Sequence, residues 1–160
     1  MRAKRTVLIG GLVAGALDLL GAFISSWLRA GTSPVRVMQS IAAGVLGAAA
    51  RTGGARSAAL GVLLHFVIAT IWTAVYYAAS RRLRLLSRQP TVCGGVYGVV
   101  VYLFMNFVVI PLSAVPRGNA APPLSARLVG AGIIVVCVGL PIALIVSATS
   151  RRRDTTHPAE

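Results

Sequence analysis

Four long apolar runs dominate this 160-residue sequence and limit what it can fold into. A helix of about 20 apolar residues crosses the ~30 Å hydrocarbon core of a bilayer and satisfies its own backbone hydrogen bonds there. Each run is continuous rather than alternating, which favours helices over barrel strands. The sequence therefore predicts an all-α integral membrane bundle whose four transmembrane helices cover residues 7–28, 57–79, 92–114 and 128–147.

Composition supports this class of protein and excludes others. Hydrophobic residues make up 56% of the chain, more than a soluble domain of this length can bury. The net charge of +13 could indicate nucleic-acid binding, but the basic residues fall in short clusters between apolar runs, as topology signals do. We expect a single membrane domain over residues 1–150, a lipid bilayer as its partner and no nucleic acid. Residues 151–160 are expected to form a disordered cytoplasmic tail.

The segment Pro34–Ala50 is short for a span and contains Arg36 and Gln39. With four spans and the N-terminus inside, ten basic residues lie inside and six outside, whereas a fifth span would give seven and nine. The positive-inside rule favours the first arrangement, with both termini cytoplasmic. Pro34–Ala50 then forms a short helix on the outer side, interfacial or re-entrant, with Ser33 as its N-cap and Pro34 in its first turn.

The N-terminus also has some marks of a signal peptide. Three basic residues precede the apolar run, and residues 14–16 (AGA) resemble a cleavage site. The apolar run continues for twelve residues beyond this point, unlike a cleaved peptide. We therefore expect the first span to be retained.

Asp18 is the only acidic residue among the first 153 and lies within the first apolar run. A carboxylate at this depth costs roughly 2.5–3.5 kcal/mol on insertion scales, which makes it a candidate functional group. Small and polar residues at steps of three and four place it on a face that packs against other helices, and each span has such a face. The faces are Gly11, Ala14 or Gly15, Asp18, Ala22 and Ser25; Gly61, His65, Ala69, Thr73 and Tyr76; Gly94, Gly98, Tyr102, Asn106 and Ser113; and Gly132, Gly139 and Ala143.

Depth brings three of these side chains into one layer. Counted from the outer ends of the spans at 1.5 Å per residue, Asp18 is ~15 Å deep, and His65 and Asn106 are each ~12 Å deep. The sequence thus predicts a polar intramembrane site of Asp18, His65, Asn106 and Tyr102. Gln39 and Pro111 are expected to contribute from the outer side, Pro111 by kinking or breaking its helix.

Three interpretations of this layer compete. It can be a hydrogen-bonded cluster that fixes helix packing in a structural or accessory subunit. It can instead bind a small ligand or relay protons, because burial disfavours the charged forms of both Asp18 and His65. A metal or haem site is disfavoured because the spans hold a single histidine. No cofactor is predicted, and the sequence has no catalytic motif that would indicate an enzyme.

Cysteines, aromatic residues and glycine pairs add further expectations. Cys93 and Cys137 differ by ~13 Å in depth, too far for a disulfide, and are expected to be small buried hydrophobes. Trp27, Trp72, Tyr76 and Tyr77 are expected to be interfacial anchors, and Pro141 a kink. The Gly11–Gly15 and Gly94–Gly98 spacings suit internal packing and self-association equally, so a homo-oligomer or another membrane partner stays open.

Four stretches of the sequence carry a resemblance to a protein family. These are GLVAGALDLL in the first run, SPVRVMQSIAAGVLGAAA on the outer side, LHF in the second run and YLFMNFVVIPLSAVP in the third. Together they resemble an uncharacterised family of bacterial inner-membrane proteins of about 160 residues, over most of residues 7–147. The resemblance implies a four-helix protein of the bacterial inner membrane and brings no assigned activity with it.

Overall fold

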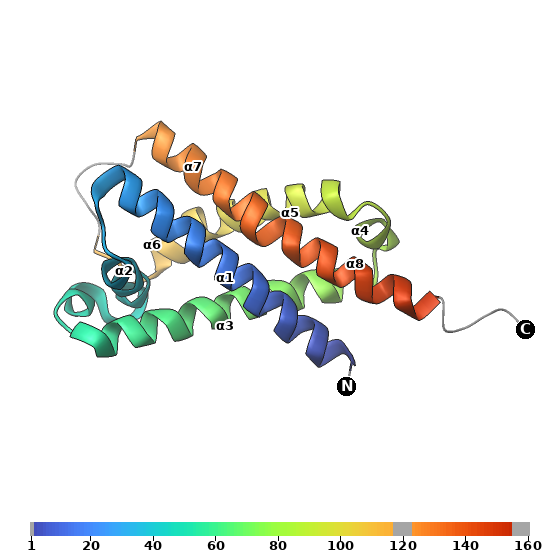
Figure 1. The fold of residues 1–160 in the computed structure, drawn as a ribbon, viewed down its shortest axis with the longest axis horizontal. Helices are drawn as coiled ribbons and strands as arrows, with labels where there is room; N and C mark the ends of the chain where they lie inside the picture. Colours follow the sequence, from blue (N-terminus) through green and yellow to red (C-terminus); the bar gives the residue numbers. More distant parts are fainter. Residues whose placement is uncertain (1, 117–122, 155–160) are drawn as a thin grey trace, which may run out of the picture.

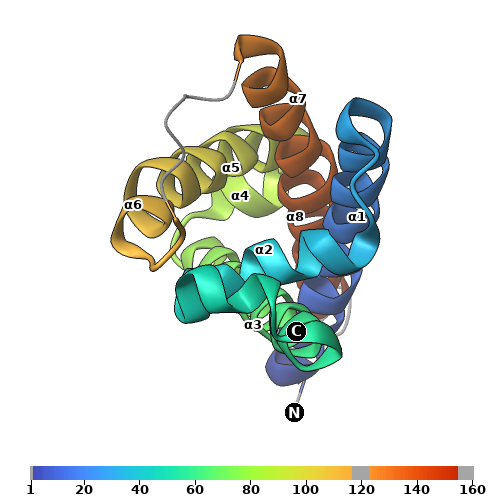
Figure 2. The same ribbon diagram turned by 90° about the vertical axis from the view of Figure 1, so that its left-hand side faces the viewer.

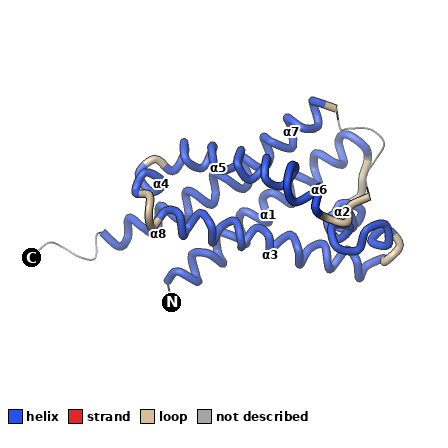
Figure 3. The backbone as a smooth tube through the Cα atoms, turned by 180° about the vertical axis from the view of Figure 1, so that it is seen from behind, coloured by secondary structure: helices blue, strands red, loops and turns tan. Residues whose placement is uncertain are grey.

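The chain is almost entirely helical in the computed structural model, which describes residues 2–116 and 123–154. No strand occurs within these ranges (Figure 3). The elements in chain order are α1 (Arg2–Ala30), α2 (Pro34–Leu46), the 3₁₀ helix η1 (Gly47–Arg51), α3 (Gly54–Ser80), α4 (Arg84–Arg88), α5 (Pro90–Phe104), the π-helix η2 (Met105–Val109), α6 (Ile110–Leu112), α7 (Leu124–Ile134), the π-helix η3 (Val135–Gly139) and α8 (Leu140–Asp154).

Four rods are long and apolar enough to cross a membrane, which confirms the predicted fold class. They are α1, α3, the continuous rod α5–η2–α6 and the continuous rod α7–η3–α8. With 27 residues, α3 is ~40 Å long, more than the hydrocarbon core requires. Large apolar side chains face outward along the rods, among them Leu12 and Ile24 of α1. Such a surface suits lipid rather than water, and the chain is a multi-pass membrane protein.

The two ends of the bundle differ (Figure 1). At the basal end α1 begins, α8 ends and α4 links α3 to α5. At the opposite end, which we call the α2 end, lie α2 and η1. In Figure 2, which looks onto the α2 end, α2 runs across the bundle instead of along it. This matches the short non-spanning helix predicted for Pro34–Ala50.

Local sequence explains how α1 gives way to α2. Gly31 ends α1 with a left-handed φ of 59°, and its N–H donates to the carbonyl of Trp27 at 2.8 Å. Ser33 then caps α2, because its hydroxyl accepts from the N–H of Arg36 at 3.4 Å, and Pro34 occupies the first turn. The predicted N-cap and first turn are therefore confirmed.

Two prolines stand at the same position relative to two π-helices. Pro111 comes two residues after η2, and Pro141 comes two residues after η3. A proline within a helix lacks an N–H donor, and its ring clashes with the carbonyl four residues earlier. A wider turn relieves this clash, and in both rods the residue before the proline donates five residues back, Ile110 to Met105 and Leu140 to Val135. The expected kinks are thus π-helical turns.

Tight packing between α5 and the α7–η3–α8 rod depends on glycine. A β-carbon on Gly139 would collide with the backbone at Gly94 and Gly98, and one on Gly98 would lie 2.6 Å from the Cα of Val135. On α1, a β-carbon on Gly11 would likewise lie 2.7 Å from the Cα of Thr70. The glycine pairs that suited either role are therefore used for packing within the chain.

The basal half of the bundle is densely packed. Its core contains Tyr76, Ile142 and Val146, all fully buried, with Trp72 and Tyr97 packed against it. The hydroxyl of Tyr97 donates to the carbonyl of Trp72 at 2.6 Å, and that of Tyr76 donates to the carbonyl of Leu86 at 3.1 Å. Tyr76 is therefore not the interfacial anchor expected from the sequence, because its hydroxyl finds a backbone partner inside the bundle. Trp27 remains exposed at the α2 end.

Three other expectations fail locally. Gly132 faces open space and is not part of a packed face, although Gly139 and Ala143 are. Ser113 lies beyond the end of α6 in extended backbone, so it leaves the predicted helical face. The backbone of α8 is helical through Asp154, into the segment expected to be disordered, since arginine is a good helix former. Residues 155–160 of that tail lie outside the described part of the chain.

Candidate functional site

A cavity of about 370 Å³ extends from the α2 end to about the middle of the bundle. All four rods and α2 contribute to its wall. The wall is mainly apolar, with Leu19, Ile41, Ile68, Trp72, Met105 and Ile133 among its residues. Its polar side chains are Asp18, Ser25, Ser26 and Arg29 from α1, Ser40 from α2, His65 from α3 and Asn106 from η2. An apolar pocket with a few polar groups is the usual form of a small-molecule site.

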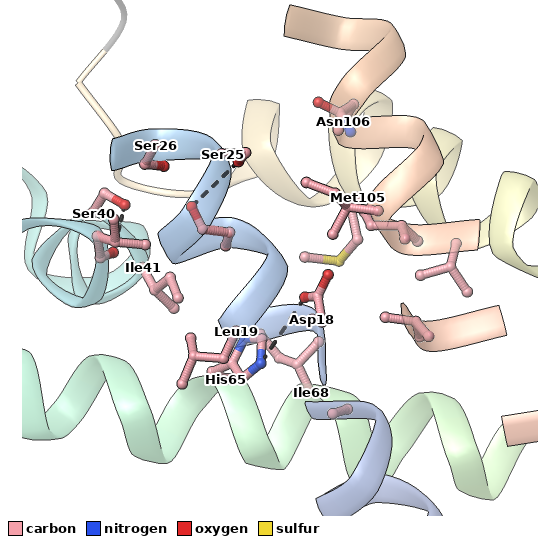
Figure 4. A pocket seen from close by; sticks show the side chains of 18 of the residues that line it. Asp18, Leu19, Ser25, Ser26, Ser40, Ile41, His65, Ile68, Met105 and Asn106 are labelled. Carbon is pink, nitrogen blue, oxygen red and sulfur yellow. Dashed lines mark hydrogen bonds and ion pairs between the residues drawn. The ribbon is translucent and has the colours of Figure 1, made fainter. Parts of the chain in front are cut away.

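Asp18 and His65 meet at this cavity, as the sequence predicted. The carboxyl Oδ2 of Asp18 lies 3.9 Å from Nε2 of His65 (Figure 4). The two side chains are mostly buried, with 21% of Asp18 and 13% of His65 exposed. Twelve residues separate Asp18 from the end of α1, and eleven separate His65 from the start of α3, so both lie ~17 Å below the α2 end.

The ring of His65 also ties α3 to α1. Its Nε2 lies 2.8 Å from the carbonyl oxygen of Gly15. A carbonyl can only accept a hydrogen bond, so this contact assigns the proton to Nε2. Phe66 supports the ring edge-on, with centroids 5.6 Å apart. His65 is thus held against α1 one helical turn from Asp18, and its proton is directed at the backbone.

Asn106 lines the same cavity without joining the pair. Its Nδ2 donates to the carbonyl of Tyr102 in its own rod at 2.9 Å. In Figure 4 the side chain of Met105 lies between Asp18 and Asn106. Asn106 is also only six residues from the end of α6, ~9 Å below the α2 end. The predicted single layer is therefore a deep pair with a shallower amide above it.

The remaining predicted residues lie elsewhere. Tyr102 does not line the cavity; its ring stands behind Gly130, 3.8 Å from where a β-carbon would be. Gln39 is buried, and its Nε2 donates to the carbonyl of Gly54 at 3.2 Å, which joins α2 to the start of α3. Pro111 is exposed after η2 and is not in the cavity wall, which its neighbour Ile110 enters.

Sequence reasoning missed Ser26, Arg29, Ser40 and Met105, and it assigned Trp72 to the membrane interface. Ser26 and Arg29 follow Asp18 at steps of eight and eleven residues on α1. These steps place them on the same helical face as Asp18, so a helical wheel could have found them. Ser40 enters through the crossing of α2, and Trp72 through the packing of α3 on α5, which no local pattern encodes.

The cavity ends where the aromatic cluster of the basal half begins. The ring of Trp72 packs edge-on against Phe104 at 5.3 Å and against Tyr97 at 6.1 Å, and Tyr97 packs against Tyr76 at 4.8 Å. These contacts join α3 to α5 on the basal side of the cavity. On the basal side the lining residues of the cavity end at Trp72, Val101 and Val138.

The fold and cavity define a class: a helical membrane protein with four candidate spans and an apolar cavity that contains an Asp–His pair. Comparisons with family models, curated proteins and solved structures gave no match. Within the described ranges, no group of three or more His, Cys, Asp or Glu side chains could hold a metal ion. Cys93 and Cys137 are both free thiols. The polar chemistry of the site therefore depends on the Asp18–His65 pair and the walls around it.

Proposed function

We propose that this protein binds a small amphipathic solute in the cavity, with the Asp18–His65 pair as its polar contact and as a group that holds or releases a proton. The proposal rests on one observation: Asp18 and His65 line a cavity of about 370 Å³. This volume is within the range of small-molecule sites. A carboxyl and an imidazole at mid-membrane depth are costly, and ionisable groups so placed are typical of solute and proton sites.

We further propose that the α2 end faces the outside of a bacterial inner membrane and that both termini are cytoplasmic. The four-span topology predicted from the sequence assigns ten basic residues to the side of the termini and six to the other side. Among the ten are Lys4, Arg5, Arg81, Arg82, Arg84 and Arg88. In this orientation the cavity is reached from outside, and the aromatic cluster closes it toward the cytoplasm.

One observation favours a second candidate, a structural or accessory subunit. The His65–Gly15 contact joins α3 to α1 at 2.8 Å and would fix their register whether or not a solute binds. The two functions differ in what happens when the cavity is filled. A structural subunit should tolerate a filled cavity, whereas a binding protein should lose its response to solutes.

The test uses Trp72, which lines the cavity and is one of two tryptophans in the chain. In a Trp27→Phe background, the emission of Trp72 reports occupancy. Three probes share one apolar body: 3-phenylpropylamine, 3-phenyl-1-propanol and 3-phenylpropionate. We expect at least one probe to give a saturable change in the purified protein. No response to any of them at millimolar concentration would contradict the proposal.

Two matched substitutions on α1 test whether the probe that changes the Trp72 emission binds in the cavity. Ala22→Phe places a ring in the cavity, whereas Leu12→Phe places it on the outward, lipid-facing side. The probe response should disappear in the first variant and persist in the second. A response that survives Ala22→Phe would mean that the probe binds elsewhere.

A further inference from the structure

The hydroxyls of Ser25 and Ser40 and the imidazole of His65 donate their protons to backbone carbonyls. A serine hydroxyl has one proton to donate, and a neutral imidazole has one N–H. Each of these protons is already engaged in the structure. The contacts are Ser25 Oγ to Ala22 O at 3.3 Å, Ser40 Oγ to Val37 O at 2.6 Å and His65 Nε2 to Gly15 O at 2.8 Å.

These three side chains therefore meet a solute mainly as acceptors, while donors remain on Ser26, Arg29 and Asn106 toward the α2 end. Ser25 and Ser40 keep lone pairs on Oγ, and Asp18 presents a carboxyl. The 3.9 Å between Asp18 Oδ2 and His65 Nε2 is longer than a hydrogen bond. The carboxyl is 21% exposed and lines the cavity, so a donor from a bound molecule can reach it.

The walls indicate what kind of donor fits. A hydrated metal ion would need several oxygen ligands, and the wall carries one carboxylate amid apolar side chains. An organic cation brings its own apolar body, which suits Leu19, Ile68 and Ile133. Trp72 adds an indole ring to the wall, and the face of an indole attracts ammonium groups.

We propose that the solute is an organic ammonium ion whose N–H groups donate to the Asp18 carboxylate and whose apolar body fills the cavity. This inference rests on the proposed binding function and names its ligand class. It also implies competition with protons, because a proton on Asp18 removes the charge that the ammonium needs.

The other charged and titratable groups near Asp18 are few. His65 faces it from α3, and Cys137 of η3 lies close enough for an electrostatic interaction. Arg29 lies on the same helix as Asp18, eleven residues or ~16 Å along the axis, and is exposed at the rim. Water and salt screen a charge at that distance, so Arg29 does not exclude a cation from the base of the cavity.

The three phenylpropyl probes test this choice directly, because they differ only in the polar group. We expect the Trp27→Phe protein in detergent to bind 3-phenylpropylamine at least about tenfold more tightly than 3-phenyl-1-propanol, and 3-phenylpropionate most weakly. If the alcohol or the acid binds as tightly as the amine, the ammonium proposal fails while the binding function stands. If none binds, both fail.

Asp18→Asn removes the charge with little change in shape, and Asp154→Asn removes the same charge at the end of α8. The first should weaken amine binding roughly tenfold to a hundredfold and change alcohol binding by less than about threefold. The second should leave both affinities unchanged. An amine affinity that survives Asp18→Asn would overturn the proposal.

A measurement on the unaltered site does not depend on how Asp18→Asn folds. Between about pH 8 and about pH 3.5 an alkylammonium stays charged, as a lysine does, whereas a carboxyl with the ordinary aspartate pKa of about 3.9 takes up its proton. Amine affinity should fall as the pH is lowered across this range, because protons compete for Asp18, and alcohol affinity should not. An amine affinity that is constant or increases toward acidic pH would contradict the assignment.

Discussion

At the scale of single residues, the Asp18–His65 pair shows how a buried charge is accommodated. His65 donates from Nε2 to the carbonyl of Gly15 and lies 3.9 Å from the Asp18 carboxyl. The imidazole is therefore held in place by the backbone and does not depend on Asp18 for its orientation. This leaves the carboxyl free to change partners while the helices remain packed, which is what a binding site requires.

The role of the His65 hydrogen bond can be separated from that of its ring. In His65→Gln an amide N–H can still donate toward Gly15, whereas His65→Leu removes the donor. We expect His65→Leu to lower the free energy of unfolding by about 0.6–1.7 kcal/mol relative to His65→Gln, the range found for hydrogen bonds between membrane helices. Thermal unfolding in one detergent measures the difference. Equal stability of the two variants would show that the contact contributes nothing.

At the scale of elements, glycines and prolines determine how the rods meet. Gly139 lets η3 touch α5, and η2 and η3 each precede a proline by the same spacing. A π-helical turn holds one more residue than an α-helical turn, so side chains beyond it lie on a different face from the one that α-helical spacing gives. Tyr102, before η2, lies near Gly130, whereas Asn106, within η2, lines the cavity.

Two glycines of the same rod give a matched test of this packing. Gly139→Ala drives a methyl group into the backbone of α5, whereas Gly132→Ala places it in open space. We expect the first to destabilise the protein by about 1–3 kcal/mol, as overpacking does, and the second to change stability by less than about 0.5 kcal/mol. Thermal unfolding of the two variants measures this. A neutral Gly139→Ala would mean that the rods separate at little cost.

At the scale of the whole molecule, the bundle is asymmetric along the membrane normal. The basal half contains the buried core of Tyr76, Ile142 and Val146, and the half toward α2 contains the cavity. The four-span topology predicted from the sequence assigns the excess of basic residues to the basal side. Because the cavity lies in the half toward α2, the orientation of the bundle in the membrane decides which compartment lies nearer to it.

Single cysteines test this orientation. In a Cys93→Ala, Cys137→Ala background, Thr52→Cys lies exposed at the α2 end and Gln89→Cys lies exposed at the basal end. We expect a membrane-impermeant maleimide to label Thr52→Cys in intact spheroplasts and Gln89→Cys only after permeabilisation, because the basal end is the more basic. The opposite pattern would place the cavity on the cytoplasmic side.

The sequence alone determined the fold class, the four spans and the burial of Asp18 and His65, because helical length, hydropathy and face are local properties of one segment. The start of α2 also followed locally, from Ser33 and Pro34. The tertiary structure decided the cavity, the separation of Asn106 from the Asp18–His65 pair and the burial of Tyr76, since these depend on how far apart helices lie. That spacing is fixed by backbone contacts such as those at Gly139 and by two π-helical turns. Periodicity within one helix contains no information on the distance between helices or on the position of a π-helical turn. For this reason the single polar layer predicted from depth is, in the structure, a deep Asp18–His65 pair and a shallower Asn106.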